Sequence, residues 1–202
     1  MLAIVDYGAG NLFSVKNACE YLSIEAVITR DPAAIRRADG IILPGVGAFP
    51  DAMSKLSETG LIPVIQEEAG KKPLLGICLG MQMLFDSSSE FGYTKGLGLI
   101  PGSVGRICCG SLKLPHIGWN ALTIRQPSPL LADTKDGDCV YFVHSFAAAC
   151  APQYLLATTE YGGTIPALVG NGHIFGAQFH PEKSGPVGLS MLKNFAKVVA
   201  EE

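Results

Sequence analysis

Four short apolar segments near the start of the chain limit what it can fold into. They are separated by glycine, proline and residues with helical periodicity, and they comprise Leu2–Asp6, Ala26–Thr29, Gly40–Leu43 and Leu74–Ile77. Strands that alternate with helices form parallel sheets, which the helices cover on both faces. A hydrophobic content of 48% fits such a buried sheet. The sequence therefore predicts an α/β fold with a mostly parallel, twisted central sheet flanked by helices.

The helices are predicted from apolar residues that recur at positions i, i+3 and i+4. The first helix begins after Asn11, whose side chain is of a type that caps helices. Its apolar face comprises Val15, Ala18, Cys19 and Leu22. Pro32 can open the second helix, because proline is tolerated in a first turn. This second helix is expected near residues 33–38, and further helices are expected over residues 51–56, 61–69, 81–85 and 187–199.

The composition of the sequence changes from about Gly92 onward. Glycine and proline become frequent, and strands with little helix between them are expected over residues 119–124, 141–144, 155–159 and 174–179. We expect these strands to pair antiparallel and to occupy edges. No linker, repeat or low-complexity tract divides the chain, so the prediction is one domain that spans residues 1–202.

Charge and composition disfavour several classes of partner. The formal net charge is −3 and no basic run is present, so a nucleic-acid partner is not expected. The longest nearly apolar stretch, Leu74–Phe85, is interrupted by polar residues and glycines, and it is shorter than the roughly 20 residues of a membrane span. The six cysteines form no Cys-x-x-Cys pair, and the first residues look like a strand rather than a signal peptide. These features favour a cytoplasmic protein.

The segment Gly76-Ile77-Cys78-Leu79-Gly80 lies where a predicted strand runs into a predicted helix. A nucleophile at such a junction sits on a tight turn, and flanking glycines relieve the crowding. The start of a helix also favours the thiolate form of a cysteine. Cys78 is therefore a candidate nucleophile, although a buried structural cysteine fits this pattern alone about equally well.

A second candidate group follows the last predicted strand, at His180-Pro181-Glu182. In an extended chain the side chains of His180 and Glu182 point to the same side. The carboxylate can then orient the imidazole, and the imidazole can take a proton from Cys78 and return it to a leaving group. The alternative for a lone histidine is a hydrogen-bonded residue at a strand end. Pairing with a cysteine on a tight turn favours the catalytic reading.

A third candidate is the glycine-rich segment Pro44-Gly45-Val46-Gly47, which follows a predicted strand. Peptides at Gly45, Val46 and Gly47 can turn an N–H toward the end of a neighbouring strand, while the amide of Leu79 supplies another donor. Together these amides form a candidate oxyanion hole. An ordinary glycine-rich turn remains the alternative.

No metal or other cofactor is predicted. Cys78, His180 and Glu182 are possible zinc ligands, but no fourth ligand is indicated and the glycines around Cys78 would then have no purpose. The remaining histidines show no paired spacing and are interpreted as structural or interfacial residues: His116, His144 and His173.

The sequences GICLGMQ at residues 76–82 and QFHPEKS at residues 178–184 resemble those of class I, or triad, glutamine amidotransferases. The resemblance implies a single-domain class I glutamine amidotransferase fold with extra antiparallel strands in its second half. It also implies that Cys78 attacks the side-chain amide of L-glutamine and forms a glutamyl thioester, and that His180 and Glu182 control release of ammonia. Gln82 and Glu90 would contact the carboxylate and ammonium groups of the glutamine.

Several shorter segments resemble one subfamily, the glutaminase subunits of imidazole glycerol-phosphate synthases. They are residues 6–12, 44–47, 114–120 and 141–145. The resemblance implies a (β/α)8 cyclase as partner, which uses the ammonia to make imidazole glycerol phosphate and AICAR in histidine biosynthesis. It places Asn11, Trp119, Tyr141 and Lys183 at the interface. The subfamily often has methionine where this chain has Ile117, and residues 86–93 match it loosely.

Two alternatives remain open at this point. One is a glutaminase that serves a pyridoxal phosphate, anthranilate or GMP synthase, which the segments 6–12 and 114–120 disfavour. The other is a non-catalytic module on a flavodoxin-like scaffold, in which nothing would require Glu182 beside His180. We further expect the isolated chain to be a poor glutaminase, because its glycine-rich oxyanion segment needs a peptide rearrangement that the docked partner triggers.

Overall fold

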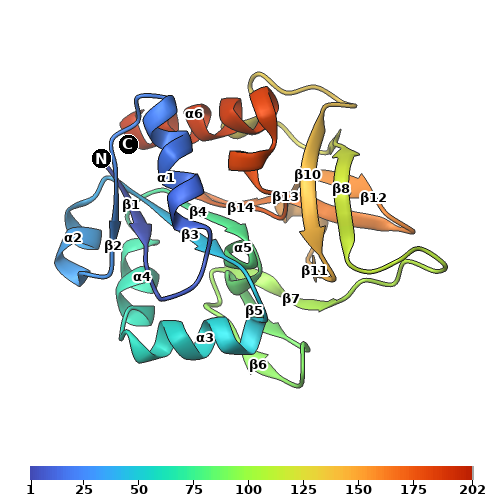
Figure 1. Cartoon of the computed structure of the whole chain (residues 1–202), viewed down its shortest axis with the longest axis horizontal. Coiled ribbons are helices and arrows are strands. Elements are labelled where there is room, and N and C mark those ends of the chain that lie inside the picture. Colours follow the sequence, from blue (N-terminus) through green and yellow to red (C-terminus); the bar gives the residue numbers. More distant parts are fainter. Residues whose placement is uncertain (202) are drawn as a thin grey trace.

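A computed structural model describes residues 1–201 and confirms the predicted α/β class (Figure 1). The central sheet has eight strands in the order β2-β1-β3-β4-β14-β13-β12-β9. Their bounds are β1 Leu2–Val5, β2 Ala26–Thr29, β3 Gly40–Gly45, β4 Leu74–Cys78, β9 Thr123–Ile124, β12 Leu155–Glu160, β13 Thr164–Asn171 and β14 Ile174–Ala177. The first five strands in this order pair parallel, and the remaining pairs are antiparallel.

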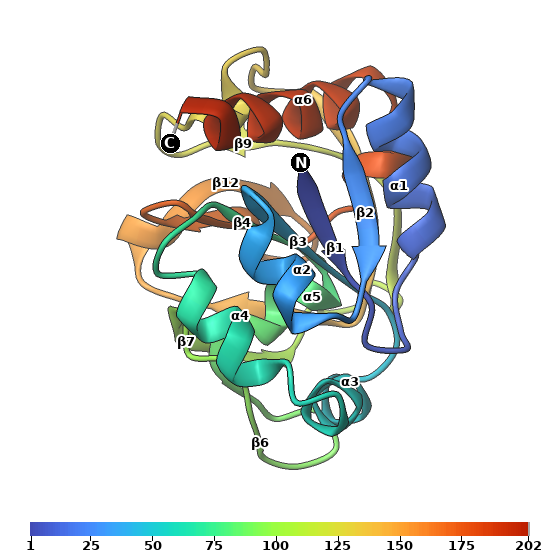
Figure 2. The same cartoon turned by 90° about the vertical axis from the view of Figure 1, so that its left-hand side faces the viewer.

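Helices cover both faces of this sheet (Figure 2). Their bounds are α1 Leu12–Tyr21, α2 Pro32–Arg37, α3 Phe49–Glu58, α4 Ile62–Glu68, α5 Leu79–Met83 and α6 Gly185–Glu201. Leu2 and Ile4 of β1 belong to the core that α1 and α6 cover, whereas Ala3 and Val5 belong to the core on the side of α2 to α5. Side chains alternate between the faces of a strand, so both faces of β1 are buried, as a parallel sheet requires.

Two smaller sheets complete the second half of the chain. One has the order β11-β7-β5-β6, and the other pairs β10 with β8. The bounds are β5 Phe85–Ser88, β6 Thr94–Lys95, β7 Ile100–Arg106, β8 His116–Ala121, β10 Cys139–His144 and β11 Phe146–Ala149. Short 3-10 turns lie at η1 Pro129–Leu131, η2 Pro152–Tyr154 and η3 Pro181–Lys183. Apart from β5 and β7, which pair parallel, the strands of these two sheets pair antiparallel, so the extra antiparallel strands predicted from the sequence are confirmed.

The last strand departs from the expectation that strands of the second half are antiparallel and peripheral. β14 lies between β4 and β13 and runs parallel to β4, with Ile174 opposite Leu74 and Ala177 opposite Ile77. All of its residues are buried. A strand covered on both faces gains most in the middle of the sheet, which explains why it inserts beside β4.

Two helix details also differ from the predictions. Asn11 occupies the N-cap position of α1, but its side chain accepts a hydrogen bond from Ser14 Oγ at 2.8 Å instead of capping a backbone N–H. The helix predicted over residues 81–85 begins earlier, at Leu79 directly after Cys78, and Phe85 already belongs to β5.

The topology brings three separate segments to one edge of the sheet. Gly45 at the end of β3 lies opposite Cys78 at the end of β4, and β14 ends beside them just before Gln178. Ligands of open parallel sheets bind outside the carboxyl ends of the strands. The segments with candidate catalytic residues therefore meet where such a fold places a site.

Gly80 shows how closely α5 packs against β3. A Cβ atom at this position would lie 1.8 Å from the carbonyl oxygen of Leu43, which is backbone and cannot swing away. We expect Gly80→Ala to lower the free energy of unfolding by about 3 kcal/mol or more, because overpacking here must displace a strand. Denaturant titration measures this loss. The matched control is Gly163→Ala, where the nearest atom would lie 4.0 Å away. Its effect should stay within about 0.5 kcal/mol, and equal effects of the two substitutions would contradict the prediction.

Candidate active site

Cys78 occupies a strained backbone position between β4 and α5. Its φ is +55° and its ψ is −111°, in a region that costs a residue with a side chain about 1–3 kcal/mol. The turn is possible because Gly76 and Gly80 have no side chains: a Cβ at Gly76 would lie 2.7 Å from the carbonyl oxygen of Gly80. Strain that the surrounding structure maintains is common at functional sites. The turn points the sulfur into a pocket rather than into the sheet.

His180 and Glu182 are hydrogen-bonded, although the segment between them is not extended as predicted. His180 itself has extended angles, with φ −99° and ψ 98°, but residues 181–183 form the 3-10 turn η3. The turn brings Glu182 Oε1 to 2.8 Å from His180 Nδ1. The His180 backbone is anchored in turn, since its N–H donates to the carbonyl of Tyr141 in β10 at 3.0 Å. The carboxylate is therefore in place to orient the imidazole.

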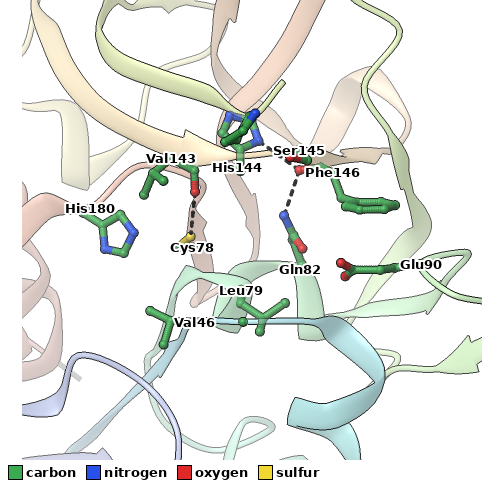
Figure 3. A pocket seen from close by; sticks show the side chains of 12 residues that line it. Val46, Cys78, Leu79, Gln82, Glu90, Val143, His144, Ser145, Phe146 and His180 are labelled. Carbon is green, nitrogen blue, oxygen red and sulfur yellow. Dashed lines mark hydrogen bonds between the residues drawn. The ribbon is translucent and has the colours of Figure 1, made fainter. Parts of the chain in front are cut away.

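The environment of His180 favours its protonated form. Burial by itself lowers the pKa of this imidazole, but the interactions with the side chains of Cys78 and Glu182 outweigh it and raise the pKa to about 9. Among the residues that the structure describes, Nε2 has no hydrogen-bond partner. Figure 3 shows the ring beside the sulfur of Cys78. The ring can thus accept a proton from the thiol and hold it.

Two groups that the sequence did not predict lie beside the sulfur of Cys78. The carbonyl oxygen of Val143 and the side-chain nitrogen of Gln178 each lie 3.9 Å from Cys78 Sγ. Gln178 Oε1 accepts a hydrogen bond from Gln82 Nε2 at 3.0 Å, and the same nitrogen donates to the carbonyl of Phe146 at 2.9 Å. Gln178 lies inside the QFHPEKS segment, but a contact 100 residues away along the chain leaves no local pattern.

A cavity of about 280 Å³ opens beside these residues (Figure 3). Its volume is close to the lower end for small-molecule sites, which suits a small metabolite. It is lined by Val46, Gly47, Cys78, Leu79, Gln82, Glu90, Pro115, Val143, His144, Ser145, Phe146 and His180. Most of the predicted catalytic, oxyanion and substrate residues therefore share one cavity.

The predicted oxyanion residues divide into a fixed and an open part. Gly45 does not line the cavity, and a Cβ at this position would come within 2.6 Å of the Gly80 nitrogen. Val46 is 45% exposed, and Gly47 has a φ of +99° with open space around its Cα. Leu79 is the first residue of α5, so its N–H has no partner inside the helix. The peptides at Val46 and Gly47 thus have room to turn, whereas Gly45 does not.

The two predicted substrate residues differ in what they offer the pocket. Glu90 is nearly buried, and one carboxylate oxygen accepts a hydrogen bond from the Phe49 N–H at 2.8 Å. Its charge can attract an ammonium group. Gln82 uses its nitrogen for protein partners and keeps its oxygen, an acceptor, for the pocket. Contact between Gln82 and a glutamine carboxylate stays a prediction, and it requires the amide to leave one of its partners.

The predicted interface residues lie on elements that contact one another. Trp119 of β8 is 58% exposed and packs edge-to-face on Tyr141 of β10, with ring centroids 6.2 Å apart. Lys183 lies on η3, which contacts both β10 and α1, and Asn11 immediately precedes α1. The four residues therefore belong to neighbouring elements around η3, the turn that contains Glu182.

His116 and His144 show no paired spacing in the sequence, but the structure makes them a buried pair, which agrees with a structural role. They face each other across β8 and β10, with His116 Nδ1 3.0 Å from His144 Nε2. Their spacing of 28 residues gave no sign of this, because strand register alone brings them together. His144 also lines the cavity.

Residues 1–201 lack two further features. No group of three or more His, Cys, Asp or Glu side chains in this range could hold a metal ion. Of the helices formed by the same residues, none combines the length and apolar character that crossing a membrane takes.

Comparisons with known proteins agree with this geometry. The model of the family described as glutamine amidotransferase class-I matches residues 3–199. A protein of Halalkalibacterium halodurans named "Imidazole glycerol phosphate synthase subunit HisH" is 53% identical over 207 residues, which cover 98% of this chain and 96% of that protein. A protein of the same name from Lacticaseibacillus casei is 52% identical over 204 residues, with 100% and 98% covered.

Solved structures show the same fold at low sequence identity. One titled "Structure of PurLQS from Thermotoga maritima" has a TM-score of 0.77 at 19% identity and covers 97% of both chains. Another, titled "Crystal structure of glutamine amidotransferase", has a TM-score of 0.76 at 20% identity and covers 98% of both chains. These structures show the fold alone, whereas the full-length relatives show the family. The chain belongs to the class-I glutamine amidotransferases and, within them, to the family of HisH subunits of imidazole glycerol phosphate synthase.

Proposed function

We propose that this chain hydrolyses L-glutamine to L-glutamate and ammonia, and that it delivers the ammonia to a (β/α)8 cyclase. The cyclase uses it to make imidazole glycerol phosphate and AICAR in histidine biosynthesis. The observation that carries the proposal is the meeting of Cys78 with the hydrogen-bonded pair His180 and Glu182 in one small cavity. The names of the full-length relatives support the choice of partner.

The reaction begins with attack of the Cys78 sulfur on the side-chain amide carbon of glutamine. His180 Nε2 takes the thiol proton, and Glu182 stabilises the imidazolium through its 2.8 Å hydrogen bond to Nδ1. The tetrahedral intermediate collapses when the imidazolium gives its proton to the nitrogen, which leaves as ammonia. A water molecule then attacks the thioester with His180 as base, and glutamate is released.

The negative oxygen of the tetrahedral intermediate needs N–H donors near Cys78. The amide of Leu79 is one, and a peptide of the segment Gly45, Val46 and Gly47 is the other. Val46 is 45% exposed and a Cβ built at Gly47 would meet no atom within 4 Å, so the Val46–Gly47 peptide can switch between an inactive and a donating orientation. Docking of the cyclase would bias that switch. The residues expected at the interface are Asn11, Trp119, Tyr141 and Lys183, and their elements lie around η3, the turn that contains Glu182.

The substrate is held at the opposite end of the cavity from His180. Glu90 supplies a negative charge for the ammonium group of glutamine (Figure 3). The side-chain nitrogen of Gln82 contacts the glutamine carboxylate once it leaves one of its two protein partners. We place the enzyme in the cytoplasm, since all six cysteines are free, as a reducing compartment would keep them.

A glutaminase assay with and without the cyclase and a ligand of its active site tests the proposal. We expect the chain alone to hydrolyse glutamine slowly and the complex to do so about 100-fold faster. Trp119→Ala should weaken the complex, whereas Tyr21→Ala, which removes an aromatic ring that is 78% exposed at the far end of α1, should not. Equal turnover with and without the cyclase would contradict activation by the partner, and stimulation by a different synthase would reassign the partner.

A further inference from the structure

A buried pair of histidines lies at one wall of the glutamine pocket, where His144 lines the cavity and His116 packs beside it. His116 of β8 and His144 of β10 are cross-strand partners, with relative exposures of 2% and 6%. The His116 ring is stacked between Phe142 and Tyr161, at centroid distances of 4.8 and 4.0 Å. The mechanism proposed above assigns no role to either histidine.

The hydrogen bonds of this pair define which nitrogens carry protons. His144 Nδ1 lies 2.9 Å from the carbonyl oxygen of Phe146, which can only accept, so this nitrogen is protonated. In a neutral ring His144 Nε2 is then an acceptor, and His116 Nδ1 must donate to it at 3.0 Å. His116 Nε2 becomes the last acceptor in a series of hydrogen bonds that runs from the Phe146 carbonyl through His144 to His116.

The far end of the series is fixed independently by Asn120 in β8. Its Nδ2 donates to the Glu160 carbonyl at 2.9 Å, and its Oδ1 accepts from the Ala121 N–H at 2.9 Å, so the orientation of the amide is not in doubt. The same Nδ2 lies 3.3 Å from His116 Nε2. Donors and acceptors match along the whole series only when both rings are neutral.

Burial keeps the two rings neutral. It lowers the pKa of His116 and lowers that of His144 to about 4, and the nearby rings of His116 and His180 disfavour a charge on His144 further. A ring that is neutral at physiological pH and has both nitrogens occupied cannot act as a base on the substrate. The pair therefore cannot take the proton-transfer role proposed for His180.

The bond to Phe146 connects the pair to the reaction centre. The Phe146 carbonyl also accepts from Gln82 Nε2, which donates in addition to Gln178, whose side chain reaches Cys78 Sγ. Residues 143–146 form one wall of the cavity, and the carbonyl of Val143 faces the sulfur. A hydrogen bond that holds the Phe146 carbonyl in place therefore also holds this wall of the cavity in place.

We propose that His116 and His144 are positioning residues of glutamine hydrolysis. As a neutral pair between β8 and β10, they hold the carbonyl of Phe146, and through it the wall formed by residues 143–146 against which glutamine is bound. The proposal deepens the proposed function and rests on it. It also gives β8, which carries the exposed Trp119, a hydrogen-bonded connection to the glutamine pocket.

Two amide substitutions separate the two bonds of His144 in the complete synthase complex. In His144→Asn the amide nitrogen lies near the former Nδ1 and keeps the bond to Phe146, whereas in His144→Gln the amide lies near the former Nε2 and keeps only the bond to His116. We expect kcat/KM for glutamine to fall about 10-fold in His144→Gln, mainly through KM, and to stay within about 3-fold of wild type in His144→Asn. A factor of ten corresponds to one buried hydrogen bond.

His116→Phe tests the second ring, since it keeps the stack with Phe142 and Tyr161 but removes the donor to His144. Its kcat/KM for glutamine should fall about as much as that of His144→Gln. The control is His173→Phe, because His173 makes a similar bond, 2.8 Å from its Nε2 to the Ala69 carbonyl, away from the cavity. We expect this control to lower the melting temperature without changing KM.

Chemical labelling of Cys78 provides a second readout. A glutamine analogue that alkylates the sulfur uses the pocket wall, so its reaction should slow about 10-fold in His144→Gln. Iodoacetamide makes no such use of the wall and should react at the wild-type rate. KM and kcat within twofold of wild type in both His144→Gln and His116→Phe, or no recovery in His144→Asn, would overturn the proposal. A wild-type complex that fails to hydrolyse glutamine would instead overturn the proposed function, and this proposal with it.

Discussion

Glutamine hydrolysis by the synthase complex should fall roughly 10^4-fold or more when Cys78 is replaced by alanine, while glutamine still binds. The sulfur is the atom that forms the thioester, and without it His180 has only water to activate. Alanine retains the backbone strain at φ +55° and fits the same space, so the turn should survive. Release of glutamate measures turnover, and calorimetric titration measures binding.

Cys19→Ala is the matched control for this substitution. Cys19 is also a fully buried cysteine, but it lies in α1 and does not line the cavity. We expect full turnover and a modest loss of stability, since a small core group is removed. A Cys78→Ala enzyme that kept more than about 1% of wild-type turnover would point to another nucleophile, whereas a wild-type complex without turnover would point to a non-catalytic binding module.

The first half of the fold was predictable because its signals are local. The strands β1 to β4 and the helices between them were expected within a few residues of where they lie, since buried parallel strands are short apolar runs and their helices repeat every three to four residues. Boundaries failed where a tight turn intervened. At Cys78, two glycines allow α5 to start immediately, which shifts the helix toward the N-terminus.

The second half was harder to predict, because its pairing depends on segments far apart in the sequence. β13 was missed altogether: it contains Pro166 and Gly170, residues that usually interrupt strands. β14 was recognised as a strand but not as a central parallel one, since its apolar run is the same whichever neighbours it has. The antiparallel pairing around β14 depends on which distant segments lie side by side, and the sequence of a single segment does not determine that.

The active site shows the same division. The residues Cys78, His180 and Glu182 were predicted because each motif is contiguous and has a chemical reason for its spacing. Gln178, the Val143 carbonyl and the histidine pair were not predicted, since their contacts join residues between 28 and 100 positions apart. Such groups position the reactive atoms and need no motif of their own, so only the three-dimensional structure reveals them.

His180→Ala should reduce turnover about 10^3-fold or more with little change in glutamine binding. The imidazole moves the proton between Cys78 and the leaving nitrogen, whereas Glu90 and Gln82 lie where they can hold the substrate. The expected signature is a collapse of kcat at nearly constant binding affinity. Glu182→Gln should cost less, about 10- to 100-fold, because the amide oxygen can still accept from Nδ1 but no longer stabilises the imidazolium.

The pH dependence of stability gives an independent test of the same ring. The pKa of His180 is about 9 in the folded protein, above the value of 6.5 for a free imidazole. The native state therefore binds this proton more tightly, so its contribution to stability is complete below about pH 6.5 and is lost as the pH rises through about 9. The free energy of unfolding of the wild type should fall across this window, and His180→Ala should lack that part of the fall. If both proteins lost stability equally, or if His180→Ala turned over normally, the ring would not be the proton carrier that the geometry implies.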